Sequence, residues 1–130
     1  MKDIKEVYPD YERQGYISSD YSLLLDSFGY ENLLQVDDDD YQGDSRVLYR
    51  NGEQYGFLTF GWGSCSGCDA LQACDTLEQA DQLRKELHDQ IIWKSPDEML
   101  AYMRNHDWKG DYGYSPEFVK KSIEILEKVA

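Results

Sequence analysis

The three cysteines of this chain are the residues best suited to chemistry, because all of them fall within one stretch of ten residues. Cys65 and Cys68 form a Cys-x-x-Cys pair, and Cys74 follows six residues later. The Ser66-Gly67 dipeptide lets the backbone curl so that both sulfurs of the pair face one point, as in a zinc knuckle. An odd number of cysteines without a signal sequence argues against a framework of disulfide bonds. The spacing therefore predicts a structural Zn²⁺ ion held by three thiolates.

A closed zinc site needs a fourth ligand, and the chain has two histidines that could supply it. His88 is separated from Cys74 by about 18 Å of rise along the helix that we expect between them. His106 falls in a segment that we expect to be an irregular loop, which is free to fold back onto the cysteines. We therefore expect His106 to complete the zinc site, with Asp69 and Asp75 as local substitutes.

A thiol-redox enzyme or a metallochaperone is the alternative function for the same cysteines. A strand leading into residues 62–68 places the pair roughly where a thioredoxin-type pair lies. Cys74 has no purpose in that motif. Pro96 and Pro116 are typical of helix starts, and neither is typical of the proline that faces such a dithiol. One buried cysteine with two incidental ones is the simplest alternative, and it also stays open.

The charge of the chain is the second informative feature. The formal net charge is −13, and residues 1–45 hold 12 acidic and 3 basic residues, which gives −9 for that part alone. Such a field repels nucleic acid and attracts basic protein surfaces, although an acidic balance also serves solubility. We therefore expect a basic protein partner and no direct contact with nucleic acid.

The densest group of acidic residues is a candidate partner-binding site. It combines a run of four consecutive aspartates with a fifth just beyond, namely Asp37, Asp38, Asp39, Asp40 and Asp44. Their spacing could copy the charges of a phosphate backbone. Calcium binding is an alternative, but the run lacks the alternating ligands and the glutamate of an EF-hand loop. A solvated loop without a ligand is the second alternative.

The pattern of apolar residues and turn signals predicts one acidic α+β domain over residues 1–130. Its strongest β signal is a hairpin in which strands 46–50 and 53–60 are joined by Asn51-Gly52, a pair that favours a type I′ turn. Further strands at 31–36 and 91–93 would complete an antiparallel meander. Capping signals predict about four helices on this sheet, at 20–28, 76–89, 95–105 and from 115 onward. Residues 1–17 show no clear periodicity, so we expect an irregular lead-in or a short strand.

Several classes of function are excluded by what the sequence lacks. No apolar run approaches the roughly 20 residues that cross a bilayer, and the N-terminus has no apolar signal core. We therefore expect a cytoplasmic protein without membrane contact. There is no phosphate-binding glycine loop, no nucleophile elbow and no distinctive carboxylate pair. We therefore expect that the protein is not an enzyme.

Two stretches of the chain also carry a resemblance to a known group of proteins. They are residues 63–71, which follow the tyrosine-rich hairpin, and residues 105–112, which include His106 and Tyr112. Over roughly residues 30–112 the chain resembles small acidic proteins of phages and prophages of Gram-positive bacteria. Some proteins of that kind are anti-CRISPR proteins that inhibit type II-A Cas9, and part of that group binds zinc. The resemblance implies a zinc-binding Cas9 inhibitor in the bacterial cytoplasm that blocks target-DNA binding by Cas9 or its guide-RNA complex.

Overall fold

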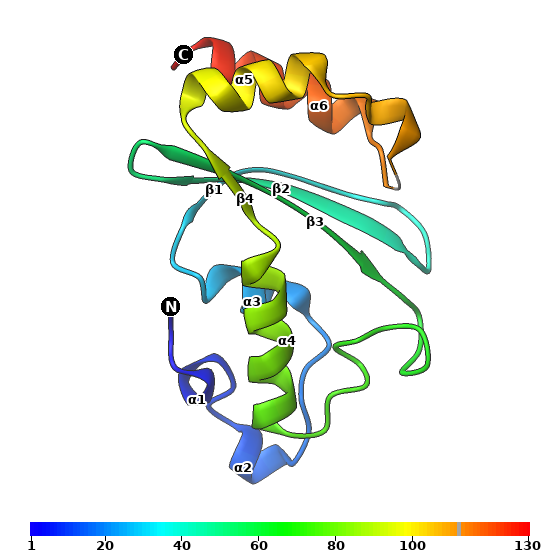
Figure 1. Cartoon of the computed structure of the whole chain (residues 1–130). Helices are drawn as coiled ribbons and strands as arrows, with labels where there is room; N and C mark the ends of the chain where they lie inside the picture. Colours follow the sequence, from blue (N-terminus) through cyan, green and yellow to red (C-terminus); the bar gives the residue numbers. More distant parts are fainter. Residues whose placement is uncertain (112) are drawn as a thin grey trace. The chain divides into compact units, whose positions relative to one another are not determined.

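The structure is a computed structural model that describes residues 1–111 and 113–130 (Figure 1). Tyr112, part of the resemblance above, lies outside the described residues. The chain forms two compact units, each built from two separate segments. The first comprises Met1–Gly29 and Trp62–Gln90, and the second comprises Tyr30–Gly61 and Ile91–Ala130. The predicted α+β class with an antiparallel meander is confirmed, and the single domain stays a prediction.

The sheet has four strands in the order β1-β2-β3-β4, so strands that are consecutive in the chain are neighbours. They are β1 (Glu31–Asp37), β2 (Gly43–Asn51), β3 (Gln54–Trp62) and β4 (Ile92–Lys94). β1 pairs antiparallel with β2, and the register shifts by one residue between Asn32 and Leu34, as in a β-bulge. All four strands predicted from the sequence are therefore present; β2 is longer than predicted at both ends, whereas β3 begins one residue later and ends two residues later than predicted.

The turn between β2 and β3 differs from the prediction. Asn51 is the last residue of β2, so the two-residue loop is Gly52-Glu53 rather than Asn51-Gly52. Gly52 has a φ of 63°. Among the described residues only glycines have a positive φ, so Glu53 does not have one. A type I′ turn needs a positive φ at both central residues, whereas a type II′ turn needs it only at the first. The predicted type I′ turn is therefore wrong, and the hairpin has the glycine position of a type II′ turn.

Two helices cover one face of the sheet in the second unit (Figure 1). α5 (Pro96–Asn105) and α6 (Pro116–Glu127) both begin with a proline after a serine N-cap, as the sequence predicts. Between them lies the short 3₁₀ helix η1 (Trp108–Gly110). The apolar faces of α5 and α6 meet β2 and β3 in one core cluster, formed by Leu48, Tyr55, Phe57, Met99, Met103, Phe118 and Leu126.

The first unit contains four helices: α1 (Ile4–Val7), α2 (Tyr11–Gln14), α3 (Tyr21–Asp26) and α4 (Leu77–Asp89). α3 and α4 match the predicted helices, and Thr76 and Gln79 form the predicted capping box of α4. The expectation of an irregular or extended lead-in is wrong, because α1 and α2 lie within residues 1–17. Each is a single turn of helix: Asp3 caps the start of α1, and Gly15, with a φ of 74°, ends α2. Helices this short leave no periodic apolar pattern to detect.

Arg84 on α4 ties three segments of the first unit together. Its side chain is 4% exposed and donates hydrogen bonds to the backbone carbonyl of Lys2, the hydroxyl of Ser27 and the carboxylate of Asp81. A buried guanidinium is stable only when such partners satisfy its charge and its donors. The N-terminus, the end of α3 and α4 are therefore held by one cation. Across residues 1–111 and 113–130, no helix has the length and apolar character needed to cross a membrane.

Candidate functional site

The cysteine loop leaves the end of β3 and runs to the start of α4 within the first unit. Its centre is the side chain of Asp69, which is 5% exposed although the residues on either side are exposed. One carboxylate oxygen, Oδ2, accepts the backbone N–H of Gly63 at 2.8 Å. The other, Oδ1, accepts the backbone N–H groups of Leu71 at 2.9 Å and Gln72 at 3.1 Å. Asp69 therefore joins the start of the loop to the turn that follows Cys68.

Tyr21 links this loop to α3. Its hydroxyl donates to Asp69 Oδ1 at 3.0 Å and accepts from the backbone N–H of Leu71 at 3.2 Å. Burial, together with the adjacent Asp69 carboxylate, raises the pKa of Tyr21 well above its ordinary value, so this phenol stays a neutral donor. The sequence indicated Asp69 only as a substitute metal ligand and did not predict this role in holding the loop. An aspartate whose carboxylate accepts the backbone N–H groups two and three residues later is a recognisable capping pattern. The contact with Tyr21 has no such local signal in the sequence.

Cys65 and Cys68 lie side by side at the exposed tip of the loop. Their sulfur atoms are 2.9 Å apart, and the Cys68 N–H donates to the Cys65 carbonyl at 3.0 Å. The Cys65 N–H points at Cys68 Sγ at 3.3 Å. The hydrogen bonds from the Cys65 thiol and backbone lower the pKa of Cys68 below that of an ordinary thiol. The predicted convergence of this pair is therefore present.

Gly63 is what allows the loop to close this tightly. A Cβ atom at this position would lie 2.5 Å from the carbonyl oxygen of Cys68 and 2.7 Å from its sulfur. Atoms cannot approach so closely without moving the backbone, and the obstructing carbonyl has no rotamer to change. The side-chain amide of Gln72 also donates to the Gly63 carbonyl at 2.8 Å. Close backbone approach therefore requires glycine here.

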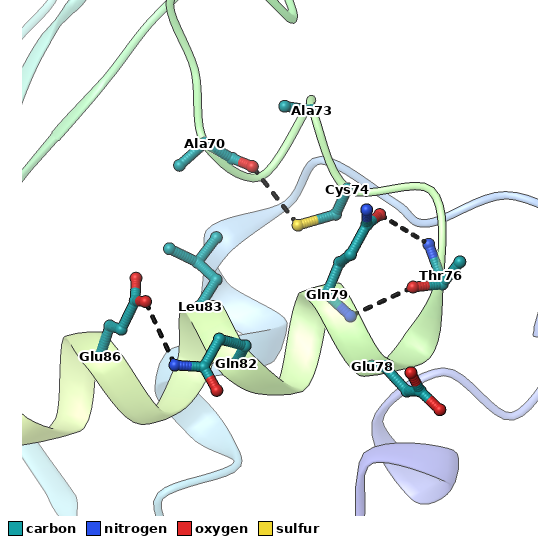
Figure 2. Close-up of a pocket in the computed structure, with 9 residues that line it drawn as sticks. All are labelled: Ala70, Ala73, Cys74, Thr76, Glu78, Gln79, Gln82, Leu83 and Glu86. Atoms are coloured by element: carbon teal, nitrogen blue, oxygen red, sulfur yellow. Dashed lines mark hydrogen bonds between the residues drawn. The ribbon is translucent and has the colours of Figure 1, made fainter.

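Cys74 has a different environment from the pair. Its thiol donates to the carbonyl of Ala70 at 3.4 Å, and Figure 2 shows it beside a groove between this turn and the exposed face of α4. Burial raises the pKa of Cys74, and the carboxylates of Asp75 and Asp69 add to the increase. Cys74 is therefore a neutral thiol, whereas Cys68 is the more acidic one. Cys74 lies two residues before Thr76, the N-cap of α4.

The other predicted metal ligands have partners of their own. Both oxygens of Asp69 accept the hydrogen bonds described above. His106 lies in the second unit, where its Nε2 is 2.6 Å from Asp111 Oδ2 and its ring stacks on Tyr102. Within residues 1–111 and 113–130, no group of three or more His, Cys, Asp or Glu side chains is placed to hold a metal ion. The zinc site of Cys65, Cys68, Cys74 and His106 stays a prediction.

The acidic run forms the connection between β1 and β2 in the second unit, and two of its members are used within the fold. Arg46 is 4% exposed, and its Nη1 donates to Asp38 Oδ1 at 2.8 Å and to the Asp44 carbonyl at 3.2 Å. Its Nε donates to the carbonyl of Gly113 at 2.6 Å. Asp44 itself is 9% exposed, and burial raises the pKa of its carboxyl group. Asp38 and Asp44 therefore hold the connection between β1 and β2 together; the Asp38 side chain is still 39% exposed, whereas Asp44 is buried.

The remaining members of the run lie exposed at the end of the hairpin that β1 forms with β2. Asp37, Asp39 and Asp40 all face solvent, and Tyr41 beside them is 85% exposed. The Tyr41 N–H donates to Asp40 Oδ1 at 2.7 Å, which fixes the backbone at this point. Partner binding by the five aspartates stays a prediction, and the exposed Tyr41 was not among the site residues predicted from the sequence.

Comparison with known proteins gave no match. Neither a scan against protein-family models, nor a search of curated proteins, nor a search of solved structures identified a protein similar to this chain. The function is therefore argued from the residues of the site.

Proposed function

We propose that this protein is a non-enzymatic inhibitor that binds the basic surface of a protein that handles nucleic acid. The observation that carries the proposal is the exposed tip of the β1–β2 hairpin, formed by Asp37, Asp39, Asp40 and Tyr41. Here an aromatic side chain that is 85% exposed stands among three solvent-facing carboxylates. Tyrosine is enriched among the residues that dominate binding energy, and the surrounding acidic charge speeds association with a basic partner.

The buried Arg46 supports this proposal because it makes the hairpin connection rigid. Asp38 accepts hydrogen bonds from both the Arg46 side chain and the Asp44 backbone, and these bonds hold the two ends of the loop together. A loop that is already ordered loses less conformational entropy when it binds. The net charge of −13 adds a long-range attraction toward any positively charged groove.

A type II-A Cas9 effector is the partner that we propose, because of the resemblance to phage inhibitors described above. Cas9 holds its RNA–DNA heteroduplex in a positively charged channel, and an acidic protein seated there would prevent target DNA from loading. The protein would act by occupying this surface and would need no chemistry of its own.

The direct test combines a pull-down with Cas9–guide complexes and a DNA-cleavage assay. We expect Asp39→Asn with Asp40→Asn to slow association about tenfold at low salt, and less at high salt where the field is screened. Tyr41→Ser should weaken binding about thirtyfold, equivalent to about 2 kcal/mol. Glu78→Gln with Asp89→Asn is the matched control, because it removes the same charge from α4.

Two results would contradict different parts of the proposal. Equal effects of the hairpin pair and the α4 pair would show that overall charge, and not the hairpin tip, drives binding. An absence of both binding and inhibition with type II-A effectors from several Gram-positive hosts would refute the proposed partner.

A structural zinc ion stays a separate prediction, and the inhibitor proposal does not depend on it. Cys65 and Cys68 would supply two ligands, and Cys74 would have to turn away from Ala70 to supply the third. Elemental analysis of protein purified without added metal tests it: about one equivalent of zinc, lost on Cys68→Ser, is expected if the prediction is right. Less than about a tenth of an equivalent would end it.

A further inference from the structure

We propose that Cys65 and Cys68 are a dithiol that reduces a disulfide compound and closes into an intramolecular disulfide bond. This would be a stoichiometric thiol–disulfide exchange, and it is independent of the inhibitor function proposed above. The substrate class is a disulfide of small thiols, for which glutathione disulfide serves as the probe.

The geometry of the two sulfur atoms supports this reaction. They are 2.9 Å apart and belong to free, exposed thiols. A disulfide bond of about 2.05 Å therefore needs an approach of about 0.9 Å. Two thiolates on one tetrahedral zinc ion, with Zn–S bonds of about 2.3 Å, would lie about 3.8 Å apart, so a zinc site needs a similar movement in the opposite direction. The sulfur–sulfur distance alone therefore does not distinguish a dithiol that closes into a disulfide bond from a zinc site.

The number of thiols that lie close together does distinguish these two kinds of site. The zinc site predicted from the sequence would require the thiolate of Cys74 and a fourth ligand at the pair, whereas a disulfide requires only the two thiols that are present. Cys74 donates its S–H to the Ala70 carbonyl and lines the groove on α4 (Figure 2). The structure thus presents two reactive thiols and one spectator.

The hydrogen bonds around the pair assign the order of the steps. While both thiols are neutral, either can donate to the other, and the Cys68 S–H also faces the Cys65 carbonyl at 3.4 Å. Once Cys68 is ionised, the N–H and the thiol of Cys65 both donate to its Sγ and stabilise the negative charge. Cys68 is therefore the attacking thiolate, and its full exposure leaves it open to a disulfide in solution. Cys65 lies beside it as the resolving thiol.

The exchange then proceeds in two balanced steps. The Cys68 thiolate attacks one sulfur of the disulfide, which forms a mixed disulfide and releases the first thiolate. Cys65 loses its proton and attacks Cys68 Sγ, which forms the Cys65–Cys68 bond and releases the second thiolate. The two cysteines give up two electrons to the disulfide that is cleaved, and their two protons balance the charge of the two released thiolates.

The test exposes the reduced full-length protein to glutathione disulfide, quenches it with acid and maps the products by mass spectrometry. Wild type and Cys74→Ser are expected to lose two hydrogen atoms and to retain no glutathione. Cys65→Ser should retain one glutathione on Cys68, because the resolving thiol is missing. Cys68→Ser should react roughly tenfold more slowly than Cys65→Ser, because its remaining thiol at the tip of the loop, Cys65, lacks the stabilising donors. Circular dichroism of each variant confirms that it is folded.

Three results would overturn the proposal. The first is a disulfide in the wild type that includes Cys74, and the second is glutathione retained by the wild type without ring closure. The third is stoichiometric zinc that protects both Cys65 and Cys68 from oxidation until a chelator is added. Equal rates for the Cys65→Ser and Cys68→Ser variants would refute the assignment of Cys68 as the attacking thiolate.

Discussion

Replacement of Asp69 tests the physical account of the cysteine loop most directly. Asp69→Asn keeps the shape of the side chain, and its remaining oxygen can still accept the N–H groups of Leu71 and Gln72. The amide nitrogen that replaces Oδ2 faces the backbone N–H of Gly63, which now donates to a carboxylate oxygen at 2.8 Å. The side-chain amide and the backbone N–H of Gly63, which are both donors, would then face each other in a buried position. The Gly63 N–H would therefore lose its acceptor.

The size of the effect follows from which donors can reach water. The hydrogen bonds from Gly63 and Leu71 to Asp69 are buried, whereas those from Gln72 and Tyr21 are partly accessible. A buried donor without a partner costs about 1–3 kcal/mol. Asp69→Asn should therefore lower the free energy of unfolding by about 1–3 kcal/mol. Asp69→Ala, which leaves the Gly63 N–H without an acceptor and the Leu71 N–H with only the Tyr21 hydroxyl, should cost about 2–4 kcal/mol, or about 10 °C in Tm.

Urea denaturation followed by circular dichroism measures these differences. Asp75→Ala is the matched control, because it removes the same charge from an exposed position of the same loop, and it should change stability by less than about 0.5 kcal/mol. If Asp69→Asn also stayed within about 0.5 kcal/mol of wild type, Asp69 would not hold the loop. A folded Asp69→Asn protein should in addition close its Cys65–Cys68 disulfide more slowly, because the start of the loop is released.

Three further substitutions test other parts of the structure. The hydrogen bond from Arg46 holds the pKa of Asp38 below its ordinary value, so the pair stabilises the protein above the unfolded-state pKa and loses this effect as pH falls through the folded-state pKa. Asp38→Asn should therefore lose less stability than wild type between about pH 5 and pH 2 in urea titrations, and identical slopes would contradict the ion pair. Gly63→Ala should cost about 1–3 kcal/mol, because the new methyl group meets the Cys68 carbonyl; an unchanged Tm would disprove the close approach. Thr76→Ala should cost about 1 kcal/mol through loss of the N-cap of α4, and thermal melts that match wild type would show the cap to be dispensable.

Features that depend on neighbouring residues in the chain could be predicted from the sequence. The capping box of α4 and the serine caps and prolines that start α5 and α6 act within one helical turn, so their signals are local. The approach of Cys65 to Cys68 is also local, because a single turn closed by the Cys68 N–H and the Cys65 carbonyl brings the sulfurs together. The meander was predictable for the same reason, since each strand pairs with the next along the chain.

Features that depend on distant residues were decided only by the tertiary structure. An aspartate in a run of four looks the same in the sequence whether it faces solvent or a guanidinium, and only packing placed the buried Arg46 beside Asp38. The contact between Asp69 and Tyr21 likewise could not be recognised, because the two residues lie 48 positions apart in the chain. Each of these side chains has several possible partners of similar strength. The partner that each one takes is settled by which segments are buried together, because only there does an unsatisfied polar group carry a large cost.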